Sequence, residues 1–183
     1  ARCSSQLIEE LRTYCPSQLE FGDGTVTIRH VYIERRMTPL NLYLRSASRE
    51  DAEKAVIEYG QAIRDLAVTN IFPGDLLLKN FGVTRHGRVI FYDYDELCLV
   101  TDCRFRDVPQ AQNDEDEMRA EAWFHVNDND VFPETFMQFL GFDAHLKEAF
   151  LKVHGEVLTA DWWRGIQQRL TEGEVLEVLP YHR

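Results

Sequence analysis

The stretch that decides the fold of this chain is NIFPGDLLLKNFG, residues 70–82, followed shortly by FYDYDE, residues 91–96. Asp75 and Asn80 lie in a turn-prone segment, because a Pro-Gly pair precedes them and an apolar-striped helix pattern ends just before it. An acidic cluster, Asp93, Asp95 and Glu96, follows the end of the next apolar strand pattern. Asn80 follows Asp75 by five positions, and Asp93 follows Asn80 by thirteen.

These intervals match the catalytic loop of kinases. In that loop an Asp positions the phosphoryl acceptor, an Asn five positions later holds one magnesium ion, and a later acidic residue holds both metal ions. Carboxylate and amide oxygens suit Mg²⁺, and a carboxylate beside the accepting hydroxyl can take its proton. The spacing therefore predicts a phosphoryl-transfer site with Asp75 as a catalytic residue and Asn80 and Asp93 as metal ligands. An exposed acidic turn is the alternative reading of the strand-end cluster, but it leaves the spacing to Asp75 and Asn80 unexplained.

The loop differs in sequence from the common catalytic-loop motif of kinases. Pro73 and Gly74 stand where His and Arg are usual, so the Arg that pairs with an activation-loop phosphate is missing, and we expect activity without loop phosphorylation. Lys79 follows Asp75 by four positions rather than two. We predict a catalytic role for Lys79, with a salt bridge to the acidic cluster as the alternative.

The segment 93–95, Asp-Tyr-Asp, replaces the Asp-Phe-Gly of common kinases. Without the Gly, the inactivating flip of this segment should be harder. Asp95 adds a second carboxylate that could polarise a water molecule for attack on a phosphoserine. We therefore predict that Asp95 is catalytic in dephosphorylation.

The bulk properties narrow the class of protein. The chain has 183 residues, of which 44% are hydrophobic and 28% charged, as expected for one globular domain. Its formal net charge of −11 argues against a nucleic-acid partner, and no apolar run approaches a signal peptide or a membrane span. The four cysteines, at 3, 15, 98 and 103, lack C-x-x-C spacing, so reduced thiols are expected rather than a zinc site.

The rest of the chain alternates short strands with helices. β-Branched residues predict a strand over 25–33, and Ser48 should cap a long helix over 49–69 with a core-facing stripe. Thr38 is expected to cap a short helix before it. A hairpin is predicted over 81–92 around a His-Gly turn.

Beyond residue 100 the pattern weakens. The acidic segment 102–129 shows little helix or strand pattern, and it is either a bland loop or an arm that recognises a partner. Short helices should follow, the third capped by Thr159 or Asp161, with Trp162 and Trp163 in the core.

Three runs of the sequence, with a fourth near its end, resemble a known family. The runs IRHVYIERRM (28–37), PGDLLLKNFG (73–82) and VTRHGRVIFYDYDE (83–96) are similar to bacterial isocitrate dehydrogenase kinase/phosphatase, and the similarity continues to DWWR (161–164). It covers the C-terminal part of that family's kinase domain. The family's regulatory domain and small lobe would lie before Ala1.

The resemblance implies an α+β, mainly helical fold: a protein-kinase-like large (C-terminal) lobe with a short strand pair at the active site. It implies one domain over 1–183, without the small lobe and the regulatory domain. Tyr32, Ile33 and Glu34 would meet the nucleotide at the hinge. The expected parts are a hinge strand at about 25–34, a catalytic loop at 70–80, a metal-binding strand end at 88–96, a substrate recognition loop at about 102–130 and C-terminal helices over 133–172.

The implied function is a bifunctional Ser/Thr protein kinase/phosphatase that uses ATP with Mg²⁺ or Mn²⁺ in a bacterial cytoplasm. Its partner would be isocitrate dehydrogenase, and its role control of flux between the citric acid cycle and the glyoxylate bypass. No glycine-rich phosphate loop precedes the hinge here, so the fragment alone is expected to be inactive. Two alternatives are a small-molecule kinase of the aminoglycoside or choline type and a non-catalytic docking fragment.

Overall fold

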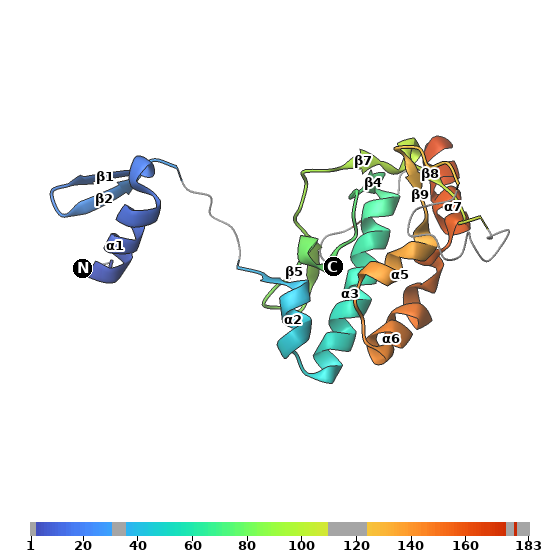
Figure 1. The fold of residues 1–183 in the computed structure, drawn as a ribbon, viewed down its shortest axis with the longest axis horizontal. Helices are drawn as coiled ribbons and strands as arrows, with labels where there is room; N and C mark the ends of the chain where they lie inside the picture. Colours follow the sequence, from blue (N-terminus) through green and yellow to red (C-terminus); the bar gives the residue numbers. More distant parts are fainter. Residues whose placement is uncertain (1–2, 31–35, 110–123, 175–177, 179–183) are drawn as a thin grey trace. The chain divides into compact units, whose positions relative to one another are not determined.

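The computed structural model describes residues 3–30, 36–109, 124–174 and 178. Its contacts fall into two compact units, Ala1–Arg35 and Arg36–Arg183 (Figure 1), where we had expected one domain. The predicted nucleotide contacts Tyr32, Ile33 and Glu34 lie outside the described residues.

The first unit consists of a helix and a hairpin. The side chain of Ser4 accepts a hydrogen bond from the Leu7 amide and caps the helix. The described part of the strand predicted over 25–33 ends at Ile28, which pairs with Leu19, the first residue of the partner strand. The elements are α1 (Ser5–Tyr14), η1 (Pro16–Gln18), β1 (Leu19–Gly22) and β2 (Thr25–Ile28).

The second unit is built around α3 (Arg49–Val68), which lies between α2 (Leu40–Ser46) and α6 (Ala144–His154) in Figure 1. As predicted, Ser48 caps α3, because its hydroxyl accepts a hydrogen bond from the Asp51 amide. One stripe of α3 is buried in the core: Ala52, Ala55, Val56, Tyr59, Gly60, Ile63 and Ala67. The stripe follows the three-four spacing of a helix that packs on a core along one side.

The predicted hairpin is present as the antiparallel strands β5 (Phe81–Val83) and β6 (Val89–Phe91). A third strand, β3 (Thr38–Pro39), pairs with β5. The prediction that Thr38 caps a helix is therefore wrong: α2 begins at Leu40 without a side-chain cap. The backbone at 38–39 is instead extended along the hairpin edge, as the residue before a proline tends to be.

Two further pairs consist of two-residue strands. The antiparallel pair is β4 (Ile71–Phe72) with β7 (Cys98–Leu99), and the parallel pair is β8 (Arg104–Phe105) with β9 (Asp130–Val131). The second pair joins the start of the acidic segment 102–129, for which little regular pattern was expected, to the two residues that follow it. The short helical turns η2 (Leu78–Asn80) and η3 (Val100–Asp102) precede β5 and β8.

Helical elements complete the second unit after β9, as predicted. They are η4 (Pro133–Thr135), α5 (Phe136–Phe139), α6, η5 (Gly155–Leu158) and α7 (Ala160–Thr171). Thr159, one of the two predicted caps, accepts a hydrogen bond from the Trp162 amide. Trp163 is fully buried, whereas Trp162 is only partly buried against the core.

These elements confirm an α+β fold. None of the described helices combines the length with the apolar composition that a bilayer crossing would require.

Candidate active site

The loop that carries Asp75 begins where α3 ends. Asn70 has a positive φ of 64°, which turns the chain from the helix into β4. Its side chain is fixed by two hydrogen bonds to Thr101: Oδ1 accepts from the Thr101 amide at 3.0 Å, and Nδ2 donates to the Thr101 hydroxyl at 3.3 Å. The start of the loop is thus tied to the segment that follows β7.

Gly74 lies against Glu96 of the acidic cluster, residues 93–96. Its φ is +70°, and a Cβ atom added there would lie 2.6 Å from the backbone oxygen of Glu96. This distance is too short for any other residue to fit without movement of the backbone. The usual Arg is therefore excluded at this position by conformation and by space, a reason that the sequence alone does not reveal.

Asp75 and Asn80 are in direct contact. Asn80 Nδ2 donates a hydrogen bond to Asp75 Oδ1, and the same oxygen accepts from the Leu77 amide at 3.1 Å. Asn80 is 5% exposed, and Asp75 is partly buried. Because the Asn80 amide nitrogen faces Asp75, its amide oxygen points away from that carboxylate.

Tyr59, a buried residue of α3, stabilises this loop with a hydrogen bond. Its hydroxyl donates a hydrogen bond of 2.5 Å to the backbone oxygen of Leu76, next to Asp75. Burial raises the pKa of Tyr59 well above its ordinary value, and the negative charge of Asp75 raises it further. The sequence placed Tyr59 in the core stripe, where nothing distinguishes a loop-supporting hydroxyl from ordinary core packing.

The hairpin brings Asp93 to the same region. The register of β5 with β6 pairs Phe81 with Phe91, and one step further the Tyr92 amide donates a hydrogen bond of 3.1 Å to the backbone oxygen of Asn80. Asp93 is the next residue after Tyr92 and is partly buried. The backbone of Asn80, one predicted metal ligand, is thus bonded to the residue directly before Asp93, the other predicted ligand.

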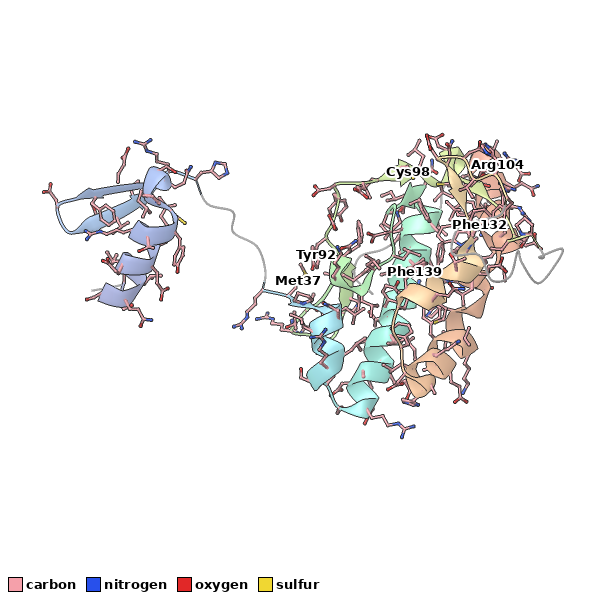
Figure 2. All side chains as sticks on the ribbon, viewed as in Figure 1. Met37, Tyr92, Cys98, Arg104, Phe132 and Phe139 are labelled. Atoms are coloured by element: carbon pink, nitrogen blue, oxygen red, sulfur yellow. The ribbon has the colours of Figure 1, made fainter. Side chains whose placement is uncertain are left out.

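Tyr92, labelled in Figure 2, links the hairpin to the loop through its side chain as well. Its hydroxyl donates a hydrogen bond to the backbone oxygen of Lys79, and a Cβ atom at Gly82 would lie 3.2 Å from its ring and 3.0 Å from Met37 Cβ. Burial raises the pKa of Tyr92, and the nearby charge of Asp93 contributes. No residue pattern predicts this link, because the hydroxyl bonds to a backbone oxygen.

The remaining predicted catalytic residues are exposed. Lys79 lies in η2 and is exposed, and Asp95 is exposed as well. Among the described residues no ion pair joins Lys79 to the acidic cluster, so its alternative role as a salt-bridge partner finds no support.

The donor atoms suit a hard divalent cation. The amide oxygen of Asn80 and the carboxylate of Asp93 are the oxygen types that Mg²⁺ prefers, and this ion commonly keeps several waters or phosphate oxygens. Within the described part of the chain, no group of three or more His, Cys, Asp or Glu side chains could hold a metal by itself. Two protein oxygens completed by phosphate and water therefore fit, whereas an all-protein cage does not.

A cavity of about 340 Å³ lies elsewhere in the second unit. It is lined by residues of α2, α3 and the hairpin turn, among them Tyr43, Lys54, Glu58 and Arg88. Arg88 and Glu58 form an ion pair at 2.8 Å in its wall. Neither Asp75 nor Asn80 lines this cavity, so it is not the predicted site.

Comparisons with known proteins point in one direction. The family model described as the isocitrate dehydrogenase kinase/phosphatase (AceK) kinase domain matches residues 1–183. A relative from Anaeromyxobacter sp. (strain Fw109-5) is 53% identical over 180 residues, and one from Serratia proteamaculans (strain 568) is 51% identical over 183 residues. Both relatives are named isocitrate dehydrogenase kinase/phosphatase. The alignments cover 98% and 100% of this chain but 31% of each relative, so the chain spans about a third of their length.

Proposed function

Because the chain belongs to the family of isocitrate dehydrogenase kinase/phosphatase kinase domains, we propose that it is the kinase-like large lobe of a bifunctional enzyme. The whole protein would phosphorylate and dephosphorylate a serine or threonine of isocitrate dehydrogenase. A phosphate at a carboxylate-binding site repels the substrate by like charge, so the reaction would divide flux between the citric acid cycle and the glyoxylate bypass. A small-molecule kinase is not favoured, because the relatives described above carry the name of a protein kinase/phosphatase.

One observation carries this proposal. Asp75 and Asn80 share a hydrogen bond, and the backbone of Asn80 is bonded to the residue before Asp93. This arrangement supports the prediction of phosphoryl transfer, which was based on the spacing of Asp75, Asn80 and Asp93. An ordinary surface turn would not need a buried Asn whose side chain bonds to a nearby carboxylate.

Each of the three residues has a role in the forward reaction. Asp75 Oδ1 is occupied by two hydrogen bonds, so its other oxygen would orient the acceptor hydroxyl and take its proton. The amide oxygen of Asn80 and the carboxylate of Asp93 would hold Mg²⁺ or Mn²⁺ with ATP. When bound, the ion neutralises charge on the phosphates. Lys79 would act on the phosphates from its exposed position, although its offset differs from that of common kinases.

Asp95 would serve the reverse reaction. It is exposed two residues beyond Asp93, where its carboxylate can accept a proton from a water molecule that attacks a phosphoserine. Removal of Asp95 would leave the three residues of the forward reaction in place. Asp95 would therefore be required for the phosphatase activity but not for the kinase activity.

The segment 102–130 would dock the dehydrogenase. Contacts in the described parts of the chain would hold the two ends of this segment in place. Arg106 forms an ion pair of 2.5 Å with Asp130, whose side chain is fully buried, and the Val108 amide donates to Glu134. From α7, Arg164 reaches Asp107 at 3.1 Å. Residues 110–123 lie outside the described structure. Tyr32, Ile33 and Glu34 would bind the nucleotide at the hinge.

The proposal is tested in the full-length protein with purified isocitrate dehydrogenase. Asp75→Ala, Asn80→Ala and Asp93→Ala should each lower phosphate transfer from ATP by about 10²-fold or more. Glu148→Ala, which removes an exposed carboxylate on α6, is the matched control and should retain activity. Full activity in all three site variants would refute the assignment.

A further inference from the structure

Two cysteine sulfurs lie next to each other beside β4, the strand that leads into the loop of Asp75. Cys98 Sγ and Cys103 Sγ are 3.5 Å apart, and both residues are free thiols. Cys98 is exposed on β7 (Figure 2), whereas Cys103 is 8% exposed and follows η3. The sequence showed only their separation by five positions, which does not predict contact.

We propose that Cys98 and Cys103 form a redox-sensitive pair that a hydroperoxide converts into an intrachain disulfide. This modification site is independent of the phosphoryl-transfer proposal. A disulfide has an S–S distance of about 2.05 Å, so the two sulfurs must approach by about 1.5 Å. Rotation of two side chains with a small backbone adjustment can supply a movement of this size.

The backbone around the pair is held from several sides. Gln167 on α7 donates two hydrogen bonds of 2.7 Å through Nε2, one to the backbone oxygen of Val100 and one to that of Cys103. The Cys103 amide donates to the Val100 oxygen at 3.2 Å, which closes the turn. These bonds hold the two thiols near each other in the folded chain, so their encounter does not require unfolding.

The different environments of the thiols set the order of reaction. Burial and the neighbouring Cys98 raise the pKa of Cys103 to about 12, so Cys103 stays protonated and shielded. The exposed Cys98 therefore meets the peroxide first. Its sulfur attacks one peroxide oxygen, the O–O bond breaks, and Cys98 sulfenic acid and one water form.

The second step uses Cys103. Its sulfur attacks the sulfenic sulfur, the S–O bond breaks, and the hydroxyl leaves as water with the Cys103 proton. In total, two thiols lose two electrons and two protons, and one hydroperoxide is reduced to two hydroxyl products, which are two waters for hydrogen peroxide. No further oxidant is needed.

The bond would form at a structurally sensitive point. Cys98 pairs with Phe72 across β7 and β4, and β4 leads directly into the loop that holds Asp75. The Val100 amide also donates to the Asn70 oxygen at 3.3 Å. A disulfide between Cys98 and Cys103 would therefore link β7, which follows the acidic cluster 93–96, to the turn that anchors this loop.

The sequence offers a direct assay, because trypsin releases residues 89–104 as one peptide that contains both cysteines. The folded full-length protein is treated with hydrogen peroxide, alkylated, digested and analysed by mass spectrometry. We expect an unalkylated peptide that is lighter than the dithiol form by two hydrogen atoms. Further cleavage before Asp102 should leave the two halves linked, and reduction should restore two alkylatable thiols.

Single variants test the order of reaction. In Cys103→Ser, Cys98 should accumulate as sulfenic acid that dimedone traps, whereas in Cys98→Ser, Cys103 should remain an alkylatable thiol. Cys15→Ser removes an exposed thiol of the first unit and should leave the disulfide unchanged. The proposal is overturned if Cys98 of the unmutated protein oxidises to sulfinic acid while Cys103 stays alkylatable. A disulfide of Cys98 with any other cysteine would overturn it as well.

Discussion

The backbone oxygen of Glu96 lies 2.6 Å from the point that a Cβ atom would occupy at Gly74. The acidic cluster, residues 93–96, therefore lies directly against the residue that precedes Asp75. This contact joins the two sequence motifs that define the candidate site, because one contains Asp75 and the other contains Asp93. The absence of a side chain at Gly74 allows the two segments to approach each other.

Gly74→Ala should destabilise the protein and displace the loop. Gly87→Ala is the matched control: Gly87 also has a positive φ, of 77°, but its Cβ would meet nothing within 4 Å. The left-handed conformation should lower the free energy of unfolding by about 1–2 kcal/mol in both variants. In Gly74→Ala, overlap with the backbone of Glu96 should lower it by about 1–3 kcal/mol more. Urea unfolding measures both, and equal losses would contradict a close contact at Gly74.

Asp95→Ala in the full-length protein should separate the two activities. Asp93 and Asn80 keep their backbone link through Tyr92, so kinase activity should change by less than about tenfold, whereas phosphate release should fall by about 10²-fold. Both rates are measured on the same preparations of phosphorylated and unphosphorylated dehydrogenase. A parallel loss of both activities would show that Asp95 serves metal binding or folding instead.

The stability of the protein should depend on the ionisation of His154. Its ring is buried in the space that Gly60 leaves open, its Nε2 bonds to the Ile57 oxygen at 3.0 Å, and its buried Nδ1 has no hydrogen-bond partner among the described residues. Burial lowers the pKa of His154 below its ordinary value of 6.5, and the positive charge of Arg64 lowers it further. The folded state thus favours the neutral ring. This contribution is complete above pH 6.5 and is lost as pH falls through the lower folded-state pKa.

We therefore expect the free energy of unfolding to decrease as the pH falls below 6.5, and to decrease less in His154→Gln than in the unmutated protein. His86→Gln removes an exposed imidazole at the hairpin turn and should keep the original slope. Chemical denaturation across this pH range provides the measurement. Identical slopes for His154→Gln and the unmutated protein would rule out His154 as the source.

The 183-residue chain by itself should bind ATP weakly and transfer no phosphate. Its second unit carries Asp75, Asn80 and Asp93, but no glycine-rich phosphate loop precedes them in this sequence. Isothermal titration with Mg²⁺ and ATP, together with a transfer assay on the dehydrogenase, gives both quantities. Robust turnover by this chain would show that it holds a complete nucleotide site.

Much of the second unit could be predicted because its signals are local. Ser48 followed by a long three-four stripe specifies α3, and a His-Gly turn between apolar runs specifies the hairpin. The spacing of Asp75, Asn80 and Asp93 predicted a common location. The hairpin register brings Asp93 within one residue of a backbone bond to Asn80.

Other features had no local signal. The pairs of β4 with β7 and of β8 with β9 involve two residues per strand, too few to show a two-residue period. Thr38 and Pro39 have the composition of a helix start, but pairing with β5 determines their structure. The contacts of Gly74 with Glu96 and of Cys98 with Cys103 depend on how separate segments cross, which composition does not encode.

The most direct test of this account is a structure of the full-length protein with Mg²⁺ and a non-hydrolysable ATP analogue. We predict an ion that contacts the phosphates, with the Asn80 amide oxygen and an Asp93 carboxylate oxygen each about 2.1 Å away. The second Asp75 oxygen should face the acceptor side of the terminal phosphate. An ion held by other residues, with Asn80 and Asp93 outside its coordination sphere, would contradict the assignment of this site.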